Sequence, residues 1–360
     1  MMKLYTFHSK NSTELGGIET LLRSLHACSK EVGLSPIELY SVNPKKSDRY
    51  FSSQADKESK VGLFSREIMV LTALINAISL LFYFLPNGNR EKTILVIFDP
   101  RALLFFPRFY LNKLKVVFVQ TSKFEVILGR ASVYTLNRLR NNISAYVVYT
   151  NTDSTRFIQL MPKIPSSKVF AIPCGCKLVS KKNVKVANKN LVTITRISPE
   201  KNLEEMIRVM KLLGNDFHLS IYGSGDREYL SYIQSQLATV KNVDFRGPTV
   251  NVEQVLREKA IFLMTSFYEG YGQTLIEARS QGLPIVAYDT FAALSTIVQD
   301  GQNGYIVSAF ETELFAKRIV ESVSEDNYYR LSRHALSRSV ETEPETIELK
   351  WKKLFLEILK

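Results

Sequence analysis

Two carboxylates stand eight residues apart in one stretch of this sequence. Glu269 precedes Gly270-Tyr271-Gly272, and Glu277 follows Gln273-Thr274-Leu275. A carboxylate accepts hydrogen bonds and therefore suits the hydroxyl groups of a sugar. The glycines permit a backbone that comes close to a ligand or takes a positive φ, and the N–H groups of residues 273–275 favour an anion if they begin a helix. The stretch predicts one anion site between two acids that bind hydroxyl groups.

Two cations follow an earlier apolar run. Arg196 and Lys201 come after residues 191–195, and Ser198-Pro199 between them is typical of the start of a helix. Ligands of open α/β sheets bind in loops at the carboxyl ends of the strands. Two cations in such a loop could neutralise a pyrophosphate leaving group. Taken alone, an Arg and a Lys at this spacing are more often solvated surface charges.

Strands and helices of the second half of the chain must position these loops. Short apolar runs predict strands and periodic runs predict helices, the strands at residues 191–195, 217–222, 243–245, 260–264 and 284–288 and the helices at residues 203–213, 229–237 and 273–281. Such an alternation predicts a parallel, doubly wound sheet. Gly223-Ser224-Gly225 follows one of the strands, and it predicts either a tight turn or a contact to the ligand.

The first half of the chain shows the same alternation. Strands are expected at residues 3–7, 93–98, 115–120 and 145–149, a helix at residues 17–30, and a linker at residues 162–190. We therefore expect an α/β protein of two Rossmann-like domains that face each other across a cleft. The domains would be residues 1–170 and 171–344, with an amphipathic helix at residues 345–360 that packs back on the first domain.

Length and composition agree with two folded domains and exclude several classes of protein. The chain has 360 residues, enough for two domains at roughly 150 residues each. Hydrophobic residues make up 45% of it, which excludes a disordered protein, and three cysteines exclude a disulfide scaffold. The first residues lack an apolar leader with a cleavage site. We therefore expect a cytoplasmic protein with reduced thiols.

The whole excess of positive charge lies in the first half of the chain. Residues 1–180 hold 24 basic and 12 acidic residues, whereas residues 181–360 hold 23 of each. A basic half indicates an anionic partner. The cations are dispersed and no nucleic-acid-binding signature accompanies them, so we expect no nucleic acid partner. An anionic membrane surface or a lipid-diphosphate acceptor explains the charge better, and a phosphate-rich polymer acceptor would do so as well. We therefore expect a peripheral protein at the inner face of the cell membrane.

Residues 68–86 form an apolar segment without charge, about as long as a membrane span. Thr72, Asn76, Ser79 and Tyr83 recur on one helical face of this segment. Since a spanning helix does not need such a stripe, we expect a buried core helix with one semi-polar face. A helix in the membrane interface and a true span are the alternatives.

Together these motifs resemble the retaining glycosyltransferases of family 4, which have the GT-B fold. The resemblance covers most of residues 190–310. The Glu-x7-Glu motif of that family matches Glu269 and Glu277, and its pyrophosphate-binding Arg and Lys match Arg196 and Lys201. The resemblance implies that Glu277 binds the donor ribose and that Glu269 contacts the transferred sugar. In the first half, only the segment around Gly17 is similar, to the glycine loop that approaches the donor phosphates.

One departure from the family pattern concerns the acceptor side. Many of these enzymes have a His after a strand of the first domain, close to the reacting sugar. Here the apolar residues 116–119 are followed by Gln120-Thr121, so Gln120 or Thr121 would take the place of that His. His8, in the loop after the first strand, is a further candidate.

The resemblance also implies an activity. A hexose-type sugar would move from a UDP- or GDP-linked donor to a lipid-linked or polymeric glycan, with no metal and no further cofactor. Retention without an enzymic nucleophile indicates front-face substitution, in which the leaving diphosphate takes the acceptor proton. A sugar-nucleotide epimerase and a non-catalytic partner subunit of similar fold are the alternatives. Neither is expected to keep the two cations and the two acids together.

Overall fold

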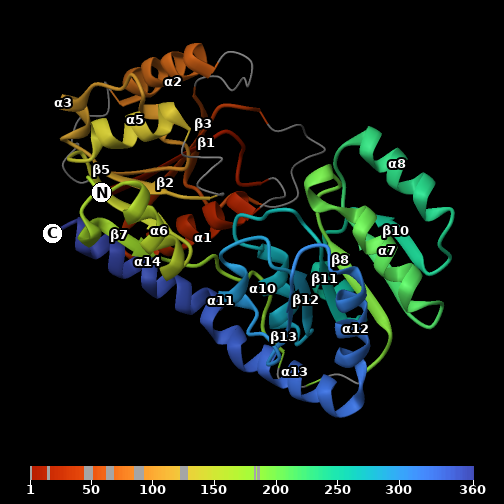
Figure 1. Cartoon of the computed structure of the whole chain (residues 1–360). Coiled ribbons are helices and arrows are strands. Elements are labelled where there is room, and N and C mark those ends of the chain that lie inside the picture. Colours follow the sequence, from red (N-terminus) through yellow and green to blue (C-terminus); the bar gives the residue numbers. More distant parts are fainter. Residues whose placement is uncertain are drawn as a thin grey trace. The chain divides into compact units, whose positions relative to one another are not determined.

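The computed structural model describes residues 2–13, 17–43, 52–61, 69–84, 93–121, 129–181, 184 and 187–360 (Figure 1). The chain divides into two compact units, the first made of Met1–Gly175 and Pro344–Lys360 and the second of Cys176–Glu343. The division falls at residue 175, where the sequence indicated residue 170. Leu15 and Gly16 of the expected glycine loop, and both ends of the apolar segment 68–86, lie outside the described residues.

The first unit contains a parallel sheet of seven strands in the order β3-β2-β1-β4-β5-β6-β7. The strands are β1 (Met2–His8), β2 (Leu34–Tyr40), β3 (Lys57–Lys60), β4 (Thr93–Ile97), β5 (Lys115–Val119), β6 (Ile143–Val148) and β7 (Val169–Ala171). Tyr5 of β1 lies opposite Ile37 of β2 and Leu95 of β4. The central strands are apolar at nearly every position, which is why the sheet is covered on both faces.

Helices cover the two faces of this sheet (Figure 1). One face packs against α2 (Met69–Phe84), η2 (Pro100–Leu103), α3 (Arg108–Leu111) and α5 (Arg130–Leu139) in a continuous apolar core. On the other, α1 (Gly17–Glu31) contacts β2 and the C-terminal helix α14 (Pro344–Ile358). The Cys28 thiol donates a hydrogen bond to the Glu348 carbonyl at 3.3 Å, so α14 is fastened to the first unit. The remaining helices are α6 (Asn151–Leu160) and η3 (Ser166–Lys168).

Helix α2 is oriented differently from the expected core helix. Its semi-polar face points inward, since Thr72 and Asn76 are buried. Its exposed face is apolar, and Phe82 is the most exposed residue on it, at 67%. The expected core helix therefore packs on the core with its semi-polar face but leaves its apolar side exposed. No helix in the described ranges is long and apolar enough to cross a membrane.

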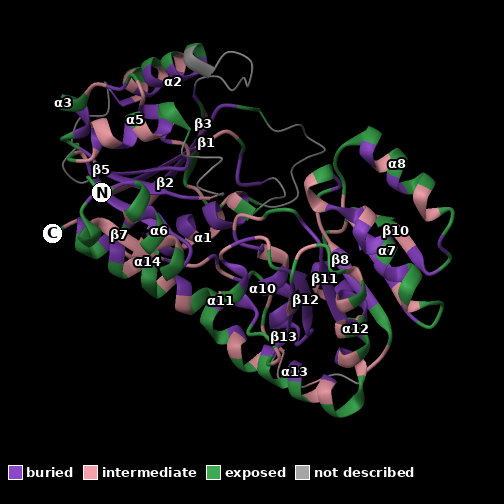
Figure 2. Ribbon diagram, viewed as in Figure 1, coloured by how far each residue is buried: buried purple, intermediate pink, exposed green. Residues whose placement is uncertain are grey.

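The second unit contains a parallel sheet of six strands in the order β10-β9-β8-β11-β12-β13. The strands are β8 (Asn190–Ile194), β9 (His218–Tyr222), β10 (Val243–Gly247), β11 (Ile261–Met264), β12 (Ile285–Tyr288) and β13 (Gly304–Val307). The helices are η4 (Pro199–Lys201), α7 (Leu203–Leu213), α8 (Arg227–Leu237), α9 (Val252–Arg257), α10 (Gln273–Ser280), α11 (Leu294–Ile297), α12 (Thr312–Val323), α13 (Glu325–Ser339) and η5 (Val340–Thr342). The buried strands and the helices around them enclose one apolar core (Figure 2).

The first and last residues of the second unit meet each other. The backbone N–H of Cys176 donates to the Thr342 carbonyl at 2.7 Å. The Cys176 thiol also donates to the Ile276 carbonyl in α10, at 3.7 Å. A hydrogen bond therefore joins the residues where the chain enters and leaves this unit, and the entering residue is also bonded to α10.

The expected doubly wound α/β class is confirmed, but four strands were not predicted from the sequence. They are β2, β3, β7 and β13. Strand β2 contains Pro36, which usually argues against a strand between two neighbours. Strand β7 lies inside residues 162–190 and pairs with β6, so the first part of the expected linker belongs to the first sheet.

Candidate functional site

The two predicted cations and one of the predicted acids gather at one edge of the second sheet. The strand order changes direction at β8, whose neighbours are β9 on one side and β11 on the other. Ligands of open α/β sheets bind at such a switch point, outside the carboxyl ends of the strands. The loop after β8 carries Arg196 and Lys201, and the loop after β11 carries Glu269. The fold thus brings together side chains that are about seventy residues apart in the sequence.

Lys201 and Glu269 form an ion pair in this place. Lys201 Nζ lies 2.7 Å from Glu269 Oε1, and each side chain is only about one-seventh exposed. The Ser266 hydroxyl donates to the same carboxylate oxygen at 2.9 Å. Arg196 is exposed at the same edge. The pair holds the ammonium group and the carboxylate in fixed positions, because a short hydrogen bond between two charged groups is strong when it is partly shielded from solvent.

Hydrogen bonds join the two loops that carry this pair. Asn202 has a left-handed backbone with φ 51°, and its side-chain amide donates to the Thr265 carbonyl at 3.2 Å. The Thr265 hydroxyl donates back to the Asn202 carbonyl at 2.9 Å. The Phe267 N–H donates to the Glu200 carbonyl, also at 2.9 Å. Asn202 and Thr265 were missed in the sequence, where the only signal was their position next to a motif residue.

Gly223 and Gly225 let a third loop approach the loop that carries Arg196. A Cβ added to Gly223 would lie 1.8 Å from the Thr195 carbonyl oxygen, and one added to Gly225 would lie 2.1 Å from the Ile197 carbonyl oxygen. The Ile197 N–H donates to the Ser224 carbonyl at 3.0 Å. These glycines therefore make room for protein backbone, and this contact positions Arg196 whether or not a ligand touches the glycines themselves.

The glycine stretch before α10 differs in detail from the expectation. Gly272 has φ 91°, and a Cβ there would lie 3.1 Å from Leu275 Cδ1. Gly270 has no positive φ, so only one of the two glycines has the unusual backbone. The Leu275 N–H donates to the Gly272 carbonyl at 3.0 Å, so it is not available to an anion as expected. Gln273 and Thr274 remain as the first two residues of the helix.

Glu277 lies on the buried side of α10 and is 2% exposed. Burial raises the pKa of its carboxyl group, and the nearby cation Lys177 and the side chain of Gln273 oppose that rise. Lys177 Nζ lies 3.3 Å from Glu277 Oε1. Lys177 is the second residue of the unit, and this pair was not predicted because one hundred residues separate the partners.

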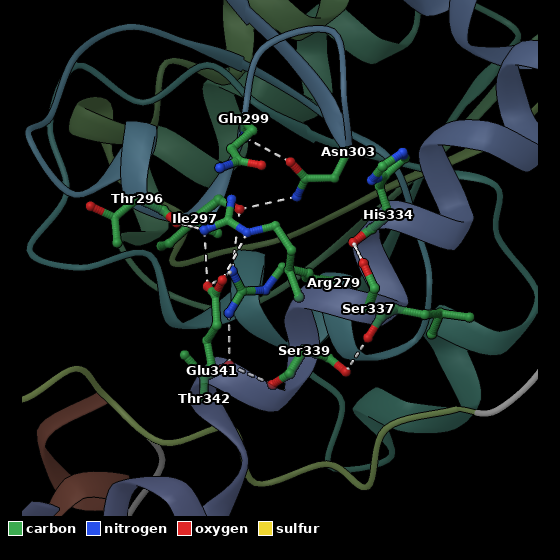
Figure 3. Close-up of polar contacts among 12 residues, drawn as sticks. Arg279, Thr296, Ile297, Gln299, Asn303, His334, Ser337, Ser339, Glu341 and Thr342 are labelled. Atoms are coloured by element: carbon green, nitrogen blue, oxygen red, sulfur yellow. Dashed lines mark hydrogen bonds and ion pairs between the residues drawn. The ribbon is translucent and has the colours of Figure 1, made fainter.

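A buried arginine near the end of α10 fastens this helix to its surroundings (Figure 3). Arg279 is 1% exposed. Its guanidinium group donates to the Thr342 hydroxyl at 2.9 Å and to the Glu341 carboxylate at 3.3 Å. It also reaches the Ile297 carbonyl at 3.4 Å, and the Asn303 amide donates to that same carbonyl at 3.0 Å. The helix that carries Glu277 is therefore fixed to the last residues of the unit.

The first unit places its candidates at the carboxyl edge of its own sheet. His8 ends β1, and its Nε2 lies 3.7 Å from Glu19 Oε1. Gln120, directly after β5, is buried, and Thr121 is half-buried. Gly17 begins α1 and is exposed, and an added Cβ would have no neighbouring atom within 4 Å, so no close contact with the described residues requires a glycine there.

A buried acid lies in the same edge as His8. Glu38 in β2 is 1% exposed and accepts hydrogen bonds from the Ser12 N–H at 2.5 Å and the Ser12 hydroxyl at 2.6 Å. Burial raises the pKa of Glu38 to about 6, although the bonds from Ser12 oppose that rise. Arg23 donates to the Ser12 carbonyl. These contacts fix the loop after β1, and sequence reasoning did not find them because Glu38 stands inside an apolar strand.

The cysteines take no part in the site. Cys28, Cys174 and Cys176 are free and buried, and burial raises the pKa of the Cys174 thiol to about 12 and that of Cys176 to about 11. Among the described residues, no cluster of three or more His, Cys, Asp or Glu side chains could hold a metal ion.

The arrangement in the second unit suits an anionic ligand with hydroxyl groups. Arg196, Lys201 and Lys177 supply three positive charges, and Glu269 and Glu277 supply two negative ones. The surplus cation favours a phosphate-bearing ligand. Each carboxylate can accept hydrogen bonds from hydroxyl groups of a ligand.

Three comparisons with known proteins bear on this site. Residues 177–339 match the family model described as Glycosyl transferases group 1. The match lies wholly within the second unit and covers nearly all of it.

Two curated relatives match over part of their length. A poly(glycerol-phosphate) alpha-glucosyltransferase of Bacillus subtilis (strain 168) is 28% identical over 154 residues, which are 41% of this chain and 23% of the relative. A poly(ribitol-phosphate) alpha-N-acetylglucosaminyltransferase of Staphylococcus aureus (strain COL) is 25% identical over 190 residues, which are 52% of this chain and 38% of the relative. The matches thus span well under two thirds of either relative.

Solved structures match over almost the whole chain. A mutant of S. aureus TarM in complex with fondaparinux, alpha-GlcNAc-glycerol and UDP has a TM-score of 0.78 at 14% identity, covering 99% of this chain and 100% of that one. The pneumococcal O-GlcNAc transferase GtfA in complex with UDP and GlcNAc has a TM-score of 0.80 at 12% identity, covering 99% of both chains. The chain has the GT-B fold, as expected.

Proposed function

We propose that this protein is a retaining glycosyltransferase of family 4 that transfers a hexose-type sugar from a nucleotide-diphosphate sugar to a glycan acceptor. The observation that carries the proposal is the Lys201–Glu269 pair, 2.7 Å apart at the switch point of the second sheet. This pair joins the cation loop and the carboxylate loop inside the stretch that matches Glycosyl transferases group 1. An epimerase or an inactive partner subunit gives no reason for these charges to be kept in fixed positions.

The roles of the donor-site residues follow from their geometry and the resemblance. Arg196 and Lys201 would face the diphosphate and stabilise the charge that develops on it as the glycosidic bond breaks. Glu269, held by Lys201 and Ser266, would accept hydrogen bonds from hydroxyl groups of the transferred sugar. Glu277 would accept hydrogen bonds from the ribose hydroxyls. The acceptor hydroxyl would attack from the face of the departing diphosphate, which takes its proton, so the configuration at the anomeric carbon is kept.

UDP is the nucleotide that we favour. The TarM and GtfA structures named above both contain UDP. A metal ion has no part in this proposal, because two cationic side chains at the switch point can balance the diphosphate charge.

The acceptor that we favour is an anionic polymer or a lipid-linked glycan of the cell surface. Both curated relatives are named for polymers of a polyol phosphate. Such a polymer repeats a negative charge along its length, and the first half of this chain holds 24 basic against 12 acidic residues. His8, Gln120 and Thr121 at the edge of the first sheet would lie on the acceptor side. A cytoplasmic location belongs to the same proposal, since three unpaired buried thiols suit a reducing compartment.

The test begins with donor binding. Purified protein is heated with each of a panel of UDP- and GDP-sugars, because a ligand that binds only the folded state raises the melting temperature. The stabilising donor is then incubated with poly(glycerol phosphate), poly(ribitol phosphate) or lipid-linked glycan, and released nucleotide diphosphate is measured. We expect release only when an acceptor is present and an α-linked product by NMR from an α-linked donor. Nucleotide-sugar isomerisation without release, or the absence of stabilisation by every donor, would contradict the proposal.

A further inference from the structure

One face of the first unit carries exposed apolar side chains that nothing in the donor chemistry uses. On α2, Leu71, Leu74, Ile78 and Phe82 are exposed at spacings of three and four residues, so they lie along one side of the helix. Phe105 and Phe109, around α3, are exposed as well. We call these six residues the α2 surface. Soluble proteins rarely expose apolar side chains in such a contiguous group without a binding role.

The parts of the α2 surface lie next to each other in the fold. The short helix η2 packs against both α2 and α5, and α3 follows it after four residues. Figure 1 shows α2, α3 and α5 together on one side of the first sheet. Arg138 of α5 donates to the carbonyls of Leu103 and Phe106, which fixes the segment between η2 and α3. In Figure 2 the outward positions of α2 are drawn as exposed.

The helix is built so that its apolar side can face outward stably. Thr72 and Asn76 are buried, and the Tyr83 hydroxyl lies 3.5 Å from the Ser59 hydroxyl of β3. Leu80 and Phe84 join the core beneath. The polar groups of α2 therefore face the protein. If the helix turned over to bury Phe82, these polar contacts and the core packing of Leu80 and Phe84 would be lost. Outward exposure is a fixed property of the folded unit.

The charges on η2, α3 and α5 are all positive. Arg108, Lys113 and Arg130 are exposed on α3, the residues after it and α5. Among residues 93–121 and 129–152, Asp99 is the one acid that the structure describes, and it lies 2.6 Å from Arg101. Helix α2 has no charged residue. An apolar stripe with cations beside it fits a surface that is apolar within and anionic at its border.

We propose that the α2 surface binds the plane of an anionic lipid bilayer, with α2 lying in the interface. A protein partner normally makes about one hydrogen bond per 100–200 Å² of interface, but the exposed positions of α2 offer no polar side chain. A lipid interior neither offers nor needs hydrogen bonds. An interfacial helix inserts its apolar face to the boundary between headgroups and acyl chains, and neighbouring Lys and Arg attract anionic headgroups.

Sedimentation with vesicles tests the proposal. The full chain is mixed at 50 mM NaCl with extruded vesicles of phosphatidylglycerol and phosphatidylcholine (1:1), or of phosphatidylcholine alone. We expect binding that is strongest with phosphatidylglycerol and weakens at 500 mM NaCl, because salt screens the charge attraction. Neither donor nor acceptor is present, so the result does not depend on the transferase proposal, and a protein that fails as a transferase can still bind vesicles.

Two variants and their controls locate the surface. Ile78→Ser/Phe82→Ser is expected to lower the partition coefficient by about tenfold or more, because two exposed apolar side chains no longer enter the bilayer. Leu212→Ser, at an equally exposed leucine of α7 in the second unit, is expected to bind like the wild type. Arg108→Ser/Lys113→Ser is expected to weaken binding at 50 mM NaCl and to match the wild type at 500 mM NaCl. The control variant Lys211→Ser/Arg227→Ser is expected to bind like the wild type at both salt concentrations.

Several outcomes would overturn the proposal. One is wild-type binding by Ile78→Ser/Phe82→Ser, and another is no binding of the wild type to anionic vesicles. A third is a wild-type dimer in analytical ultracentrifugation that Ile78→Ser/Phe82→Ser converts to a monomer, which would assign the α2 surface to a second copy of the chain. If the double variant has a lowered melting temperature, Phe109→Ser alone answers the question, because Phe109 is 67% exposed.

Discussion

In each unit the first strand is the third in its sheet, with the next strand on one side and a later strand on the other. The loops after these two strands are nevertheless built for different tasks. In the second unit, Lys201 and Glu269 stay partly open to solvent, and backbone contacts between loops hold them there. In the first unit, Ser12 and Glu38 bind each other in the interior. The same sheet edge thus presents charge to a ligand in one unit and uses charge to fix a loop in the other.

The two units also differ in what they show to solvent. The first exposes the apolar side of a whole helix and places cations beside it. In the second unit the charges are balanced, and Lys177 and Lys201 are each paired with a glutamate. The comparison teaches that a doubly wound fold determines where a site can form. A few side chains then determine whether that site can bind a small anion, a polymer or a membrane.

The largest expected effect comes from breaking the Lys201–Glu269 ion pair. Lys201→Met and Glu269→Gln are each expected to lower kcat/KM for transfer by about 100- to 1,000-fold, because a fixed charge aimed at the reacting group is lost. The matched control is Arg101→Met, which breaks the Asp99–Arg101 pair of the first unit, also closer than 3 Å. Steady-state rates of nucleotide release measure both. Equal activity of Glu269→Gln and the wild type would remove Glu269 from the site.

The next effect compares one glycine from each unit. Gly225→Ala forces a Cβ to within 2.1 Å of the Ile197 carbonyl oxygen, and we expect a loss of about 2 kcal/mol or more in the free energy of unfolding. Gly17→Ala meets no atom within 4 Å and should leave the melting temperature unchanged. If Gly17→Ala lowers donor affinity without changing stability, the glycine serves the ligand. A Gly225→Ala protein as stable as the wild type would contradict the role assigned to that glycine.

A smaller effect concerns Lys177 and Glu277. Lys177→Met removes the cation that opposes the rise in the Glu277 pKa, so that pKa rises further and ionised Glu277 is lost at higher pH. We expect UDP to bind about tenfold more weakly near neutral pH, with the fall in affinity on acidification moved to higher pH. Isothermal titration calorimetry from pH 5.5 to 8.5 measures both, and Lys177→Arg should restore them. Lys189→Met, which breaks the exposed pair with Asp216, serves as the control. An unchanged pH dependence would contradict the proposed coupling.

The smallest effect contrasts two buried acids. The pKa of Glu38 is raised to about 6 from 4.5, so the stability of the first unit falls as the pH rises through this window, by about 2 kcal/mol. Glu38→Gln should therefore raise the melting temperature at pH 7.5 and not at pH 4.5. Glu205 of the second unit behaves in the opposite sense. Burial opposes its ionisation, but hydrogen bonds from Thr312, Tyr288 and Arg208 outweigh it and lower its pKa.

Glu205→Gln should accordingly destabilise the protein at pH 7.5, with a difference from the wild type that shrinks as the pH falls below the unfolded pKa of Glu205. Differential scanning fluorimetry at each pH gives the melting temperatures. The contrast fails if both variants move the melting temperature in the same direction at pH 7.5.

Sequence periodicity was enough for the fold class, and motif spacing was enough to bring three charged residues to one edge of the second sheet. Arg196, Lys201 and Glu269 follow strands, and a parallel sheet brings the carboxyl ends of its strands to one edge. The Lys177–Glu277 pair and the Asn202–Thr265 bonds could not be predicted, because each depends on the three-dimensional register of residues far apart in the chain. Helix α2 was expected to be buried, but its apolar side is exposed. A polar stripe does not by itself determine which side of a helix faces solvent, since Thr72 and Asn76 are buried.

The bond between Cys176 and Thr342 has a consequence for how such proteins can be rebuilt. A hydrogen bond joins the two ends of residues 176–343. This stretch is therefore an insertion in the chain that begins and ends at neighbouring points. Segments with adjoining ends can be replaced or circularly permuted with little disturbance of their interior. If the proposed function holds, exchange of this stretch between relatives would give hybrids that pair the donor choice of one parent with the acceptor choice of another.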